Sequence, residues 1–428
     1  MNINLEEGYW DKKWSGCHAL NQYPFQKEVD QIISDWVKPN IKVLDLGCGT
    51  GSLMLKIRED LPNINITGLD LSSYAVKVVK AHGFKAKVAK VPPIPYKDKS
   101  FDLVIAEELL EHVDKDDELL EEMIRVGKEC IISVPEGLMY QVVKEHVNYY
   151  NELELRNKLK ELGQKFEFKK TQKRLVFRFA KKDEFKESPI KNVALGIAAY
   201  GKFYRETVMD LLAPYGGAIG DIQHQVQLNI LGKTSKFIVP ENALWLPSYI
   251  YFFSSCNIVF CRNEIVKKFL ETDSEWLWSL DVDMDYQISR IKGLIDKDKD
   301  IIGGLYKKRM PGEISTLAKY DPKVGMTVDF NYPTNEVYSC DGLGMGATVI
   351  KRDVFLKIPY PWFEYLYIGP SHKVSREPFD GGNMTGSDWS FMYKAKYQHG
   401  FQIYCDTSFL CGHVGEKTFI PSVRGEAK

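Results

Sequence analysis

The chain has 428 residues, of which 44% are hydrophobic and 27% are charged, and its formal net charge is −1. These values are ordinary for a globular protein of two or three domains. A net charge near zero gives no electrostatic reason to expect nucleic acid as a partner. No apolar run approaches the roughly 20 residues that cross a bilayer, so we expect no membrane span.

The N-terminus and the cysteines indicate the compartment. Residues 1–7 are acidic and lack the apolar core of a signal peptide. The eight cysteines are scattered and form no C-x-x-C pair, which is typical of reduced thiols. We therefore expect a cytoplasmic protein, and the sequence gives no indication of its oligomeric state.

The first strand that the sequence predicts leads into a glycine-rich turn. A short apolar run at 42–46 precedes Gly47, Gly49 and Gly51, and a helix with a regular apolar stripe follows. Glycines at alternate positions let the backbone turn tightly and lie against a ligand. About 20 residues later a second strand ends in Asp70, where a carboxylate can accept hydrogen bonds from ribose hydroxyls.

Residues 43–51 resemble the first motif of class I S-adenosylmethionine-dependent methyltransferases. Residues 100–105 and 131–135 resemble the fourth and fifth strands of that family, and the resemblance extends over residues 8–181. It implies S-adenosylmethionine as cofactor and an alternating α/β sheet. The cofactor-binding residues that it implies are Asp45, Gly47, Gly49, Gly51 and Asp70. One departure is Lys90, which lies where relatives often have an acid that contacts adenine.

A second group of polar residues follows the fourth strand. Glu108, Glu111 and His112 are spaced to share a face at the start of a helix, and His146 follows the fifth strand. This set resembles the E-x-x-E-H…H residues of small-RNA terminal 2′-O-methyltransferases and ubiquinone-pathway O-methyltransferases, which bind a divalent ion. Three interpretations remain open: a metal site, a general base at His112 or His146, and ordinary packing. We favour an O-methyl acceptor.

A charged segment that ends in proline separates the two halves of the chain. Residues 181–189 carry almost no apolar side chains, and a fresh apolar strand begins at Val193. We therefore expect an N-terminal domain at residues 1–181, a linker at 182–190 and a second domain at 191–428.

The second half contains an apolar run with two tryptophans that ends in alternating acids. Asp281, Asp283 and Asp285 at one strand end repel one another unless a cation lies among them. Oxygen ligands at this spacing suit Mg²⁺ or Mn²⁺. Alternating strands and helices predict a mainly parallel sheet here. The glycines of 342–347 indicate either a close approach to a ligand or a flexible turn.

These residues resemble the family-2-like branch of the GT-A glycosyltransferases over residues 191–416. Asp281 and Asp283 match the D-x-D motif, and Asp388 matches the catalytic acid, with Ser387 in place of the usual glutamate. The resemblance implies a nucleotide-sugar donor and a glycan acceptor, with a divalent metal at Asp283 and His413. The nucleotide-sugar-binding residues that it implies are Ala199, Arg262 and Asp281.

The sequence therefore predicts an α/β protein of two Rossmann-like domains, a methyltransferase sheet followed by a GT-A domain. We expect a bifunctional enzyme that transfers a sugar to a glycan or carrier and O-methylates a hydroxyl in the same pathway. One alternative is a virus- or phage-type enzyme that modifies nucleic acid or virion glycans. Another is a methyltransferase whose second domain only binds glycan.

Overall fold

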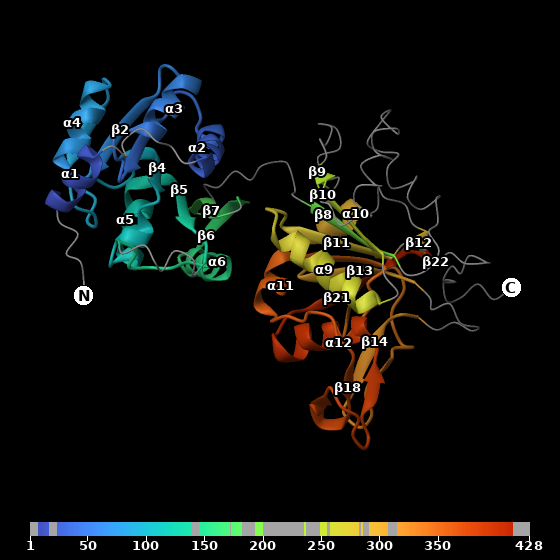
Figure 1. Cartoon of the computed structure of the whole chain (residues 1–428). Coiled ribbons are helices and arrows are strands. Elements are labelled where there is room, and N and C mark those ends of the chain that lie inside the picture. Colours follow the sequence, from blue (N-terminus) through green and yellow to red (C-terminus); the bar gives the residue numbers. More distant parts are fainter. Residues whose placement is uncertain are drawn as a thin grey trace. The chain divides into compact units, whose positions relative to one another are not determined.

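The computed structural model describes residues 7–16, 24–137, 145–171, 173–181, 193–199, 235–236, 249–254, 257–281, 284–285, 291–306 and 315–413. The chain divides into two compact units, residues 1–188 and 189–428 (Figure 1).

The first unit is built on a seven-stranded sheet of order β3-β2-β1-β4-β5-β7-β6. The first five strands in the chain pair in parallel, and β7 runs antiparallel to both β5 and β6. Their bounds are β1 (Lys42–Leu46), β2 (Asn65–Asp70), β3 (Lys85–Val88), β4 (Phe101–Glu107), β5 (Gly127–Pro135), β6 (Gln164–Lys170) and β7 (Arg174–Lys181). The α/β class expected from the sequence is confirmed for this unit.

The central strands are apolar at nearly every position because both faces of the sheet are covered. Val43 and Leu44 of β1 point to opposite faces and belong to two separate hydrophobic cores. Leu103 and Val104 of β4 divide in the same way. Such continuous apolar strands are typical of parallel sheets between helix layers.

Six helices of this unit are described, and they form the two layers seen in Figure 1. Helices α2, α3 and α4 supply one core, and α5 and α6 supply the other. The nine-residue α1 packs against α4. Their bounds are α1 (Glu7–Ser15), α2 (Pro24–Trp36), α3 (Ser52–Asp60), α4 (Ser73–Ala81), α5 (Asp116–Val126) and α6 (Glu152–Glu161).

The second unit contains an eight-stranded sheet of order β16-β21-β13-β17-β11-β8-β10-β9. The expected mainly parallel sheet is wrong, because β17 runs antiparallel to both β11 and β13, and β16 and β9 are also antiparallel to their neighbours. The bounds are β8 (Val193–Ala199), β9 (Ser235–Lys236), β10 (Tyr249–Ser254), β11 (Trp276–Asp281), β13 (Ile301–Leu305), β16 (Val337–Cys340), β17 (Ala347–Lys351) and β21 (Ile403–Leu410).

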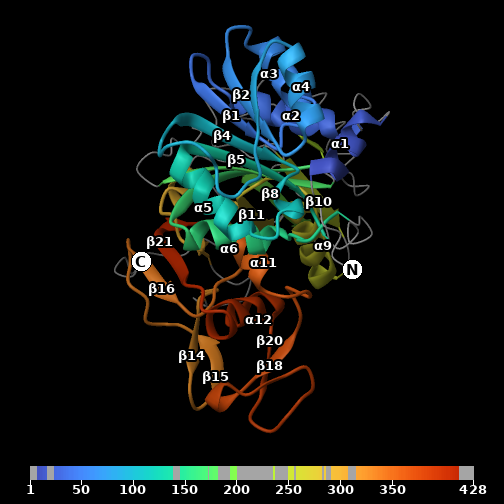
Figure 2. The same ribbon diagram turned by 90° about the vertical axis from the view of Figure 1, so that its left-hand side faces the viewer.

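Smaller elements complete the second unit. Helix α9 packs on β8 and β10, and residues of α9, α11 and α12 join one hydrophobic core with the sheet. A hairpin and a three-stranded sheet lie beyond α12 at one end of this unit (Figure 2). The bounds are α9 (Ile258–Leu270), β12 (Met284–Asp285), α10 (Ile291–Ile295), β14 (Ala318–Asp321), β15 (Gly325–Val328), α11 (Arg352–Lys357), β18 (Leu366–Ile368), β19 (Val374–Ser375), β20 (Asn383–Thr385), α12 (Ser387–Tyr393) and β22 (Gly412–His413).

Two further expectations concern the whole chain. None of the helices in the described ranges is both long and apolar enough to cross a bilayer. Six cysteines lie within those ranges, where each is buried and none forms a disulfide, whereas Cys17 and Cys256 lie outside them. The compartment stays a prediction.

A buried arginine holds the C-terminal end of α9. The guanidinium of Arg352 donates to the carbonyl oxygens of Phe269 at 3.1 Å, Leu270 at 2.8 Å and Ser274 at 3.2 Å. These carbonyls come from the end of the helix and the turn after it, where backbone oxygens lack partners within a helix. The arginine is fully buried, so water cannot replace its donors.

We expect Arg352→Met to lower the free energy of unfolding of the second unit by roughly 2–4 kcal/mol, because several buried carbonyls lose their donors. The matched change Lys267→Met removes a cation on the same helix that is 44% exposed and pairs with Glu264. That change is expected to cost about 0.5 kcal/mol or less. Scanning calorimetry of the whole chain measures both, and equal costs would contradict the role given to Arg352.

Candidate functional site

The glycine loop of the first unit lies where β1 ends. Gly47, Gly49 and Gly51 all have positive φ, at 65°, 48° and 87°, a backbone region that other residues rarely adopt. A Cβ added to Gly49 would lie 2.7 Å from the ring of Trp14. Both the backbone conformation and the space around this loop therefore require glycine.

Asp70 at the end of β2 ties this loop to the neighbouring one. Its Oδ2 accepts a hydrogen bond from the N–H of Gly49 at 2.8 Å, and its Oδ1 accepts one from the N–H of Ser72 at 2.8 Å. Because β1 and β2 are parallel neighbours, both loops leave the sheet at the same edge. Each carboxylate oxygen keeps lone-pair capacity for a further donor.

Buried carboxyl groups are concentrated beside the loop. Burial, followed by repulsion from Asp70 and then Asp30, raises the pKa of Asp45 to about 8. Burial also raises the pKa of Asp70, although its backbone hydrogen bonds act in the opposite direction. This edge of the sheet therefore favours a ligand that brings positive charge or hydrogen-bond donors.

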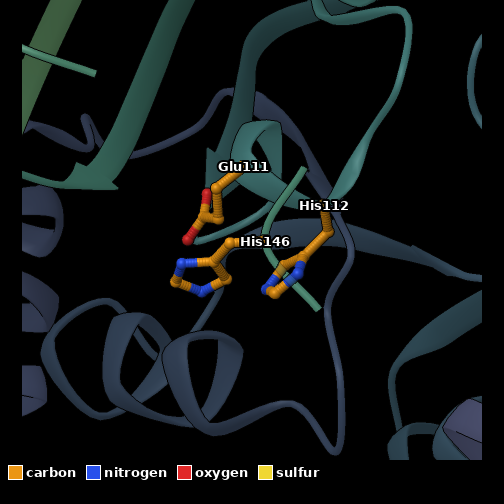
Figure 3. A group of neighbouring side chains, drawn as sticks. All are labelled: Glu111, His112 and His146. Carbon is orange, nitrogen blue, oxygen red and sulfur yellow. The ribbon is translucent and has the colours of Figure 1, made fainter. Parts of the chain in front are cut away.

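Glu111, His112 and His146 form a second group, drawn in Figure 3. One ligand atom from each lies within 4.8 Å of the others. The rings of His112 and His146 are 4.9 Å apart between centroids. Glu111 is 1% exposed, and neither of its carboxylate oxygens has a hydrogen-bond partner.

The protonation states of this group follow from burial. Burial lowers the pKa of His112, and burial followed by repulsion from His112 lowers the pKa of His146 to about 4. Burial and then Glu108 raise the pKa of Glu111 well above its usual value. At neutral pH both imidazoles are uncharged and keep a lone pair. One carboxylate and two neutral imidazoles also suit a divalent ion, which would keep Glu111 ionised.

Glu108 differs from the sequence-based expectation. Its carboxylate pairs with Nε of Arg174 at 2.6 Å and accepts a hydrogen bond from Ser133 at 3.3 Å. Its φ is 49°, and the helical turn that follows is a single 3₁₀ turn, η1 (Leu110–His112). Glu108, Glu111 and His112 therefore do not share one helix face, and Glu108 lies outside the group that the structure brings together.

Sequence reasoning missed α1, which contacts both groups. Trp14 lies against Gly49, and the ring of Trp10 is 5.3 Å from that of His112. The two tryptophans are four residues apart, a helical spacing that places them on one face. That spacing is a signal for an amphipathic helix, but it does not indicate what the helix covers.

In the second unit, Arg262 joins two predicted site acids. Its guanidinium contacts Asp281 at 3.1 and 3.2 Å and forms an ion pair with Asp388. Arg262 is 5% exposed, whereas the two carboxylates are 23% and 24% exposed. Arg262 lies in the second turn of α9.

Asp388 has further donors. Its Oδ1 accepts from Ser387 at 3.1 Å, and its Oδ2 accepts from the N–H of Met345 at 3.1 Å. Ser387 also accepts from Arg262 at 3.2 Å. The serine that replaces the usual glutamate thus belongs to the same network.

The glycine segment at 342–347 packs against Tyr306. The Tyr306 hydroxyl accepts from the N–H of Gly346 at 2.8 Å, and a Cβ on Gly344 would lie 2.0 Å from that hydroxyl. The segment is buried, so the close approach that requires glycine is made by a side chain of the protein itself.

The sequence also predicts Asp283, Ala199 and His413 for this site. Asp283 lies outside the described residues, and so do the side chains of Ala199 and His413. The backbone of β22 pairs with that of β12, which puts His413 opposite Met284 in the register.

Comparisons with known proteins concern the first unit. A family described as a methyltransferase domain matches residues 37–186. Norajmaline N-methyltransferase from Rauvolfia serpentina is 31% identical over 141 residues, which are 30% of this chain and 48% of that protein. Ubiquinone biosynthesis O-methyltransferase from Pelagibacter ubique is 32% identical over 141 residues, which are 29% of this chain and 57% of that protein.

The chain thus spans about half the length of these curated relatives. Among solved structures, magnesium protoporphyrin IX methyltransferase from Synechocystis with bound S-adenosylmethionine is similar, with 16% identity and a TM-score of 0.34. That match covers 41% of this chain and 95% of the other. On the family match and the identity to curated methyltransferases, residues 37–186 form a class I S-adenosylmethionine-dependent methyltransferase domain.

Proposed function

We propose that the first unit transfers a methyl group from S-adenosylmethionine to a hydroxyl group of an acceptor. The observation that carries this proposal is the hydrogen bond from Gly49 to Asp70, which joins the glycine loop to an acid at the end of the next strand. Gly47, Gly49 and Gly51 would admit the methionine part of the cofactor, and Asp70 would accept from the ribose. Asp45, at the end of β1, is mainly protonated at neutral pH and would add negative charge only when a cationic ligand lowers its pKa.

The histidine pair supplies the acid–base chemistry of this proposal. The methyl group would leave the sulfonium sulfur for the acceptor oxygen, and the proton of that oxygen would pass to a neutral imidazole. Both His112 and His146 have lowered pKa values, so each is uncharged at neutral pH and can accept a proton. One relative is named for an oxygen acceptor and the other for a nitrogen acceptor. We propose oxygen, since a hydroxyl must lose its proton.

A divalent ion would fit beside the histidines. This is an alternative to the base role, because Glu111, His112 and His146 would then spend their lone pairs as its ligands; the buried oxygens of Glu111, which have no hydrogen-bond partner, are the observation that supports it. Such an ion would lower the pKa of an acceptor hydroxyl. Glu108 would keep its ion pair with Arg174 and would not be a ligand of the ion.

Cofactor binding tests the methyl-transfer proposal. We expect Gly49→Ala to weaken binding of S-adenosylhomocysteine to the whole chain by at least about tenfold, which corresponds to about 1.4 kcal/mol. The reason is that the new Cβ must enter the space of Trp14 at positive φ. The control is Gly163→Ala, which has a φ of 69° but an open surrounding and should bind normally. Titration calorimetry measures both, and normal binding by Gly49→Ala would contradict the proposal.

Asp45 provides a test of the electrostatics. Its pKa of about 8 in the folded chain exceeds the ordinary value of 3.8, so the folded chain holds a proton that the unfolded chain has lost between these values. The stabilisation from that proton is complete below 3.8 and disappears as the pH rises towards 8. Asp45→Asn keeps the group neutral at every pH.

We therefore expect Asp45→Asn to raise the free energy of unfolding of the first unit, by an amount that is roughly 3–4 kcal/mol larger at pH 8 than at pH 5. S-adenosylhomocysteine should bind this variant more weakly. Calorimetric unfolding at the two pH values gives the comparison. A gain that is the same at pH 5 and pH 8 would show that the carboxyl is not protonated in the folded chain.

For the second unit we propose sugar transfer from a nucleotide-sugar to a glycan or carrier acceptor. The family match ends at residue 186 and gives no support for the second unit. The support for this proposal is the side-chain geometry of that unit. Arg262, Asp281 and Asp388 are far apart in the sequence yet meet at the end of β11. A divalent ion at Asp283 and His413 would offset the charge that develops on a leaving diphosphate.

Asp388 would act as the base in an inverting transfer. Its Oδ2 has one backbone donor and can accept a proton from an acceptor hydroxyl. Arg262 and Ser387 would hold the other oxygen and keep the carboxylate oriented. Asp281 would lie near the ribose of the donor or near metal-bound water.

Hydrolysis of UDP-, GDP- and dTDP-sugars by the whole chain, with Mn²⁺ and with EDTA, tests sugar transfer. We expect metal-dependent turnover that falls by about 10²-fold or more in Asp388→Asn. Glu271→Gln, at an acid of α9's C-terminal end that is 60% exposed, should keep full turnover. The absence of turnover with every donor would leave glycan recognition as the role of this unit.

A further inference from the structure

We propose that α1 is a lid over the cofactor site of the first unit and that its docking also fixes the tautomer of His112. This inference rests on the proposed methyl transfer. It starts from the contacts of one short helix with three separate parts of the site. The residues of α1 that make these contacts have no role in the proposed methyl transfer itself.

The first contact joins α1 to the loop that follows Asp70. The carboxylate of Asp11 accepts from the hydroxyls of Ser72 at 2.5 Å and Ser73 at 2.9 Å, and from the N–H of Tyr74 at 3.0 Å. These donors lie at the N-terminal end of α4, where backbone N–H groups lack helical partners. One acid of α1 thus holds the helix two residues from the carboxylate that would bind ribose.

The second contact covers the glycine loop. The ring of Trp14 is so close to Gly49 that a Cβ on the glycine would lie 2.7–2.9 Å from two of its atoms. The loop and the start of α4 are the two segments that Asp70 joins. A ligand between them would therefore have α1 directly over it.

The third contact reaches the histidines through Glu145. The Tyr9 hydroxyl donates to the Glu145 carboxylate, and Nζ of Lys13 lies 3.2 Å from the same oxygen. The backbone carbonyl of Glu145 accepts from Nδ1 of His112 at 2.9 Å. Since a carbonyl only accepts, Nδ1 carries the proton and Nε2 keeps the lone pair. Glu145 is therefore a positioning residue for His112.

Because α1 is short, its stability depends on these contacts. A helix of nine residues is marginal by itself in water, because isolated helices shorter than about 12–15 residues form poorly. Docking through Asp11, Trp14 and Glu145 thus stabilises α1, and loss of docking would open the site. Opening would let the cofactor exchange and would release Glu145, so that His112 loses its fixed tautomer.

The chain offers a matched pair of lysines for the test. Lys13 contacts Glu145, whereas the neighbouring Lys12 is exposed. We compare Tyr9→Phe/Lys13→Met with Lys12→Met in the whole chain, with bound S-adenosylhomocysteine displaced by excess S-adenosylmethionine. We expect dissociation to be roughly tenfold faster in the double variant and unchanged in Lys12→Met.

A dissociation rate within twofold of wild type in the double variant would overturn the lid. If wild type binds no S-adenosylhomocysteine, the proposed methyl transfer fails and the lid fails with it, so the two failures are distinguishable. A cofactor-free measurement addresses the tautomer. Nitrogen-15 NMR of the His112 ring, assigned with His112→Gln, should report Nδ1–H in wild type and a mixture in the double variant. The same tautomer in both would overturn the coupling to His112.

Discussion

The hydrogen bond between Gly49 and Asp70 is the contact on which the site of the first unit depends. Two parallel strands deliver their loops to one edge of the sheet, but that alone does not fix how the loops lie. Asp70 accepts from both Gly49 and Ser72 and so joins the glycine turn to the start of α4. Asp11 of α1 also binds the start of α4, so the position of the lid depends on the segment that Asp70 holds in place.

The acids of the two candidate sites differ in whether a cation of the protein lies beside them. In the second unit, Arg262 pairs with Asp281 and Asp388, so the acids have a cation from the protein itself. In the first unit, burial raises the pKa of Asp45 and Glu111, and the oxygens of Glu111 have no hydrogen-bond partner. Buried acids without a counter-charge reduce stability, and such arrangements are concentrated at functional sites. A ligand with positive charge would therefore be stabilised most in the first unit.

Local sequence patterns predicted the elements that are continuous and apolar. Strand β1 was predicted at its observed bounds, because its run of residues is mainly apolar and leads straight into a glycine turn. The mainly parallel sheet was wrong because strand direction depends on connections between distant segments, and β17 enters the sheet against its neighbours. The shared helix face at 108–112 was wrong because Glu108 adopts positive φ to reach Arg174, a partner 66 positions away in the sequence.

The role of α1 illustrates the limit of local reasoning most clearly. Tyr9 and Glu145 are separated by 136 positions, and Asp11 and Ser72 by 61, so no spacing within the helix identifies these partners. Seen locally, the residues that make these contacts are an ordinary acid, lysine and tyrosine of one short helix. Their function arises when the sheet brings the loop after β2 and the segment after β5 within reach of one helix. The local sequence therefore predicts the glycine loop. The docking of α1 over that loop depends on contacts between segments that are distant in the sequence of the unit.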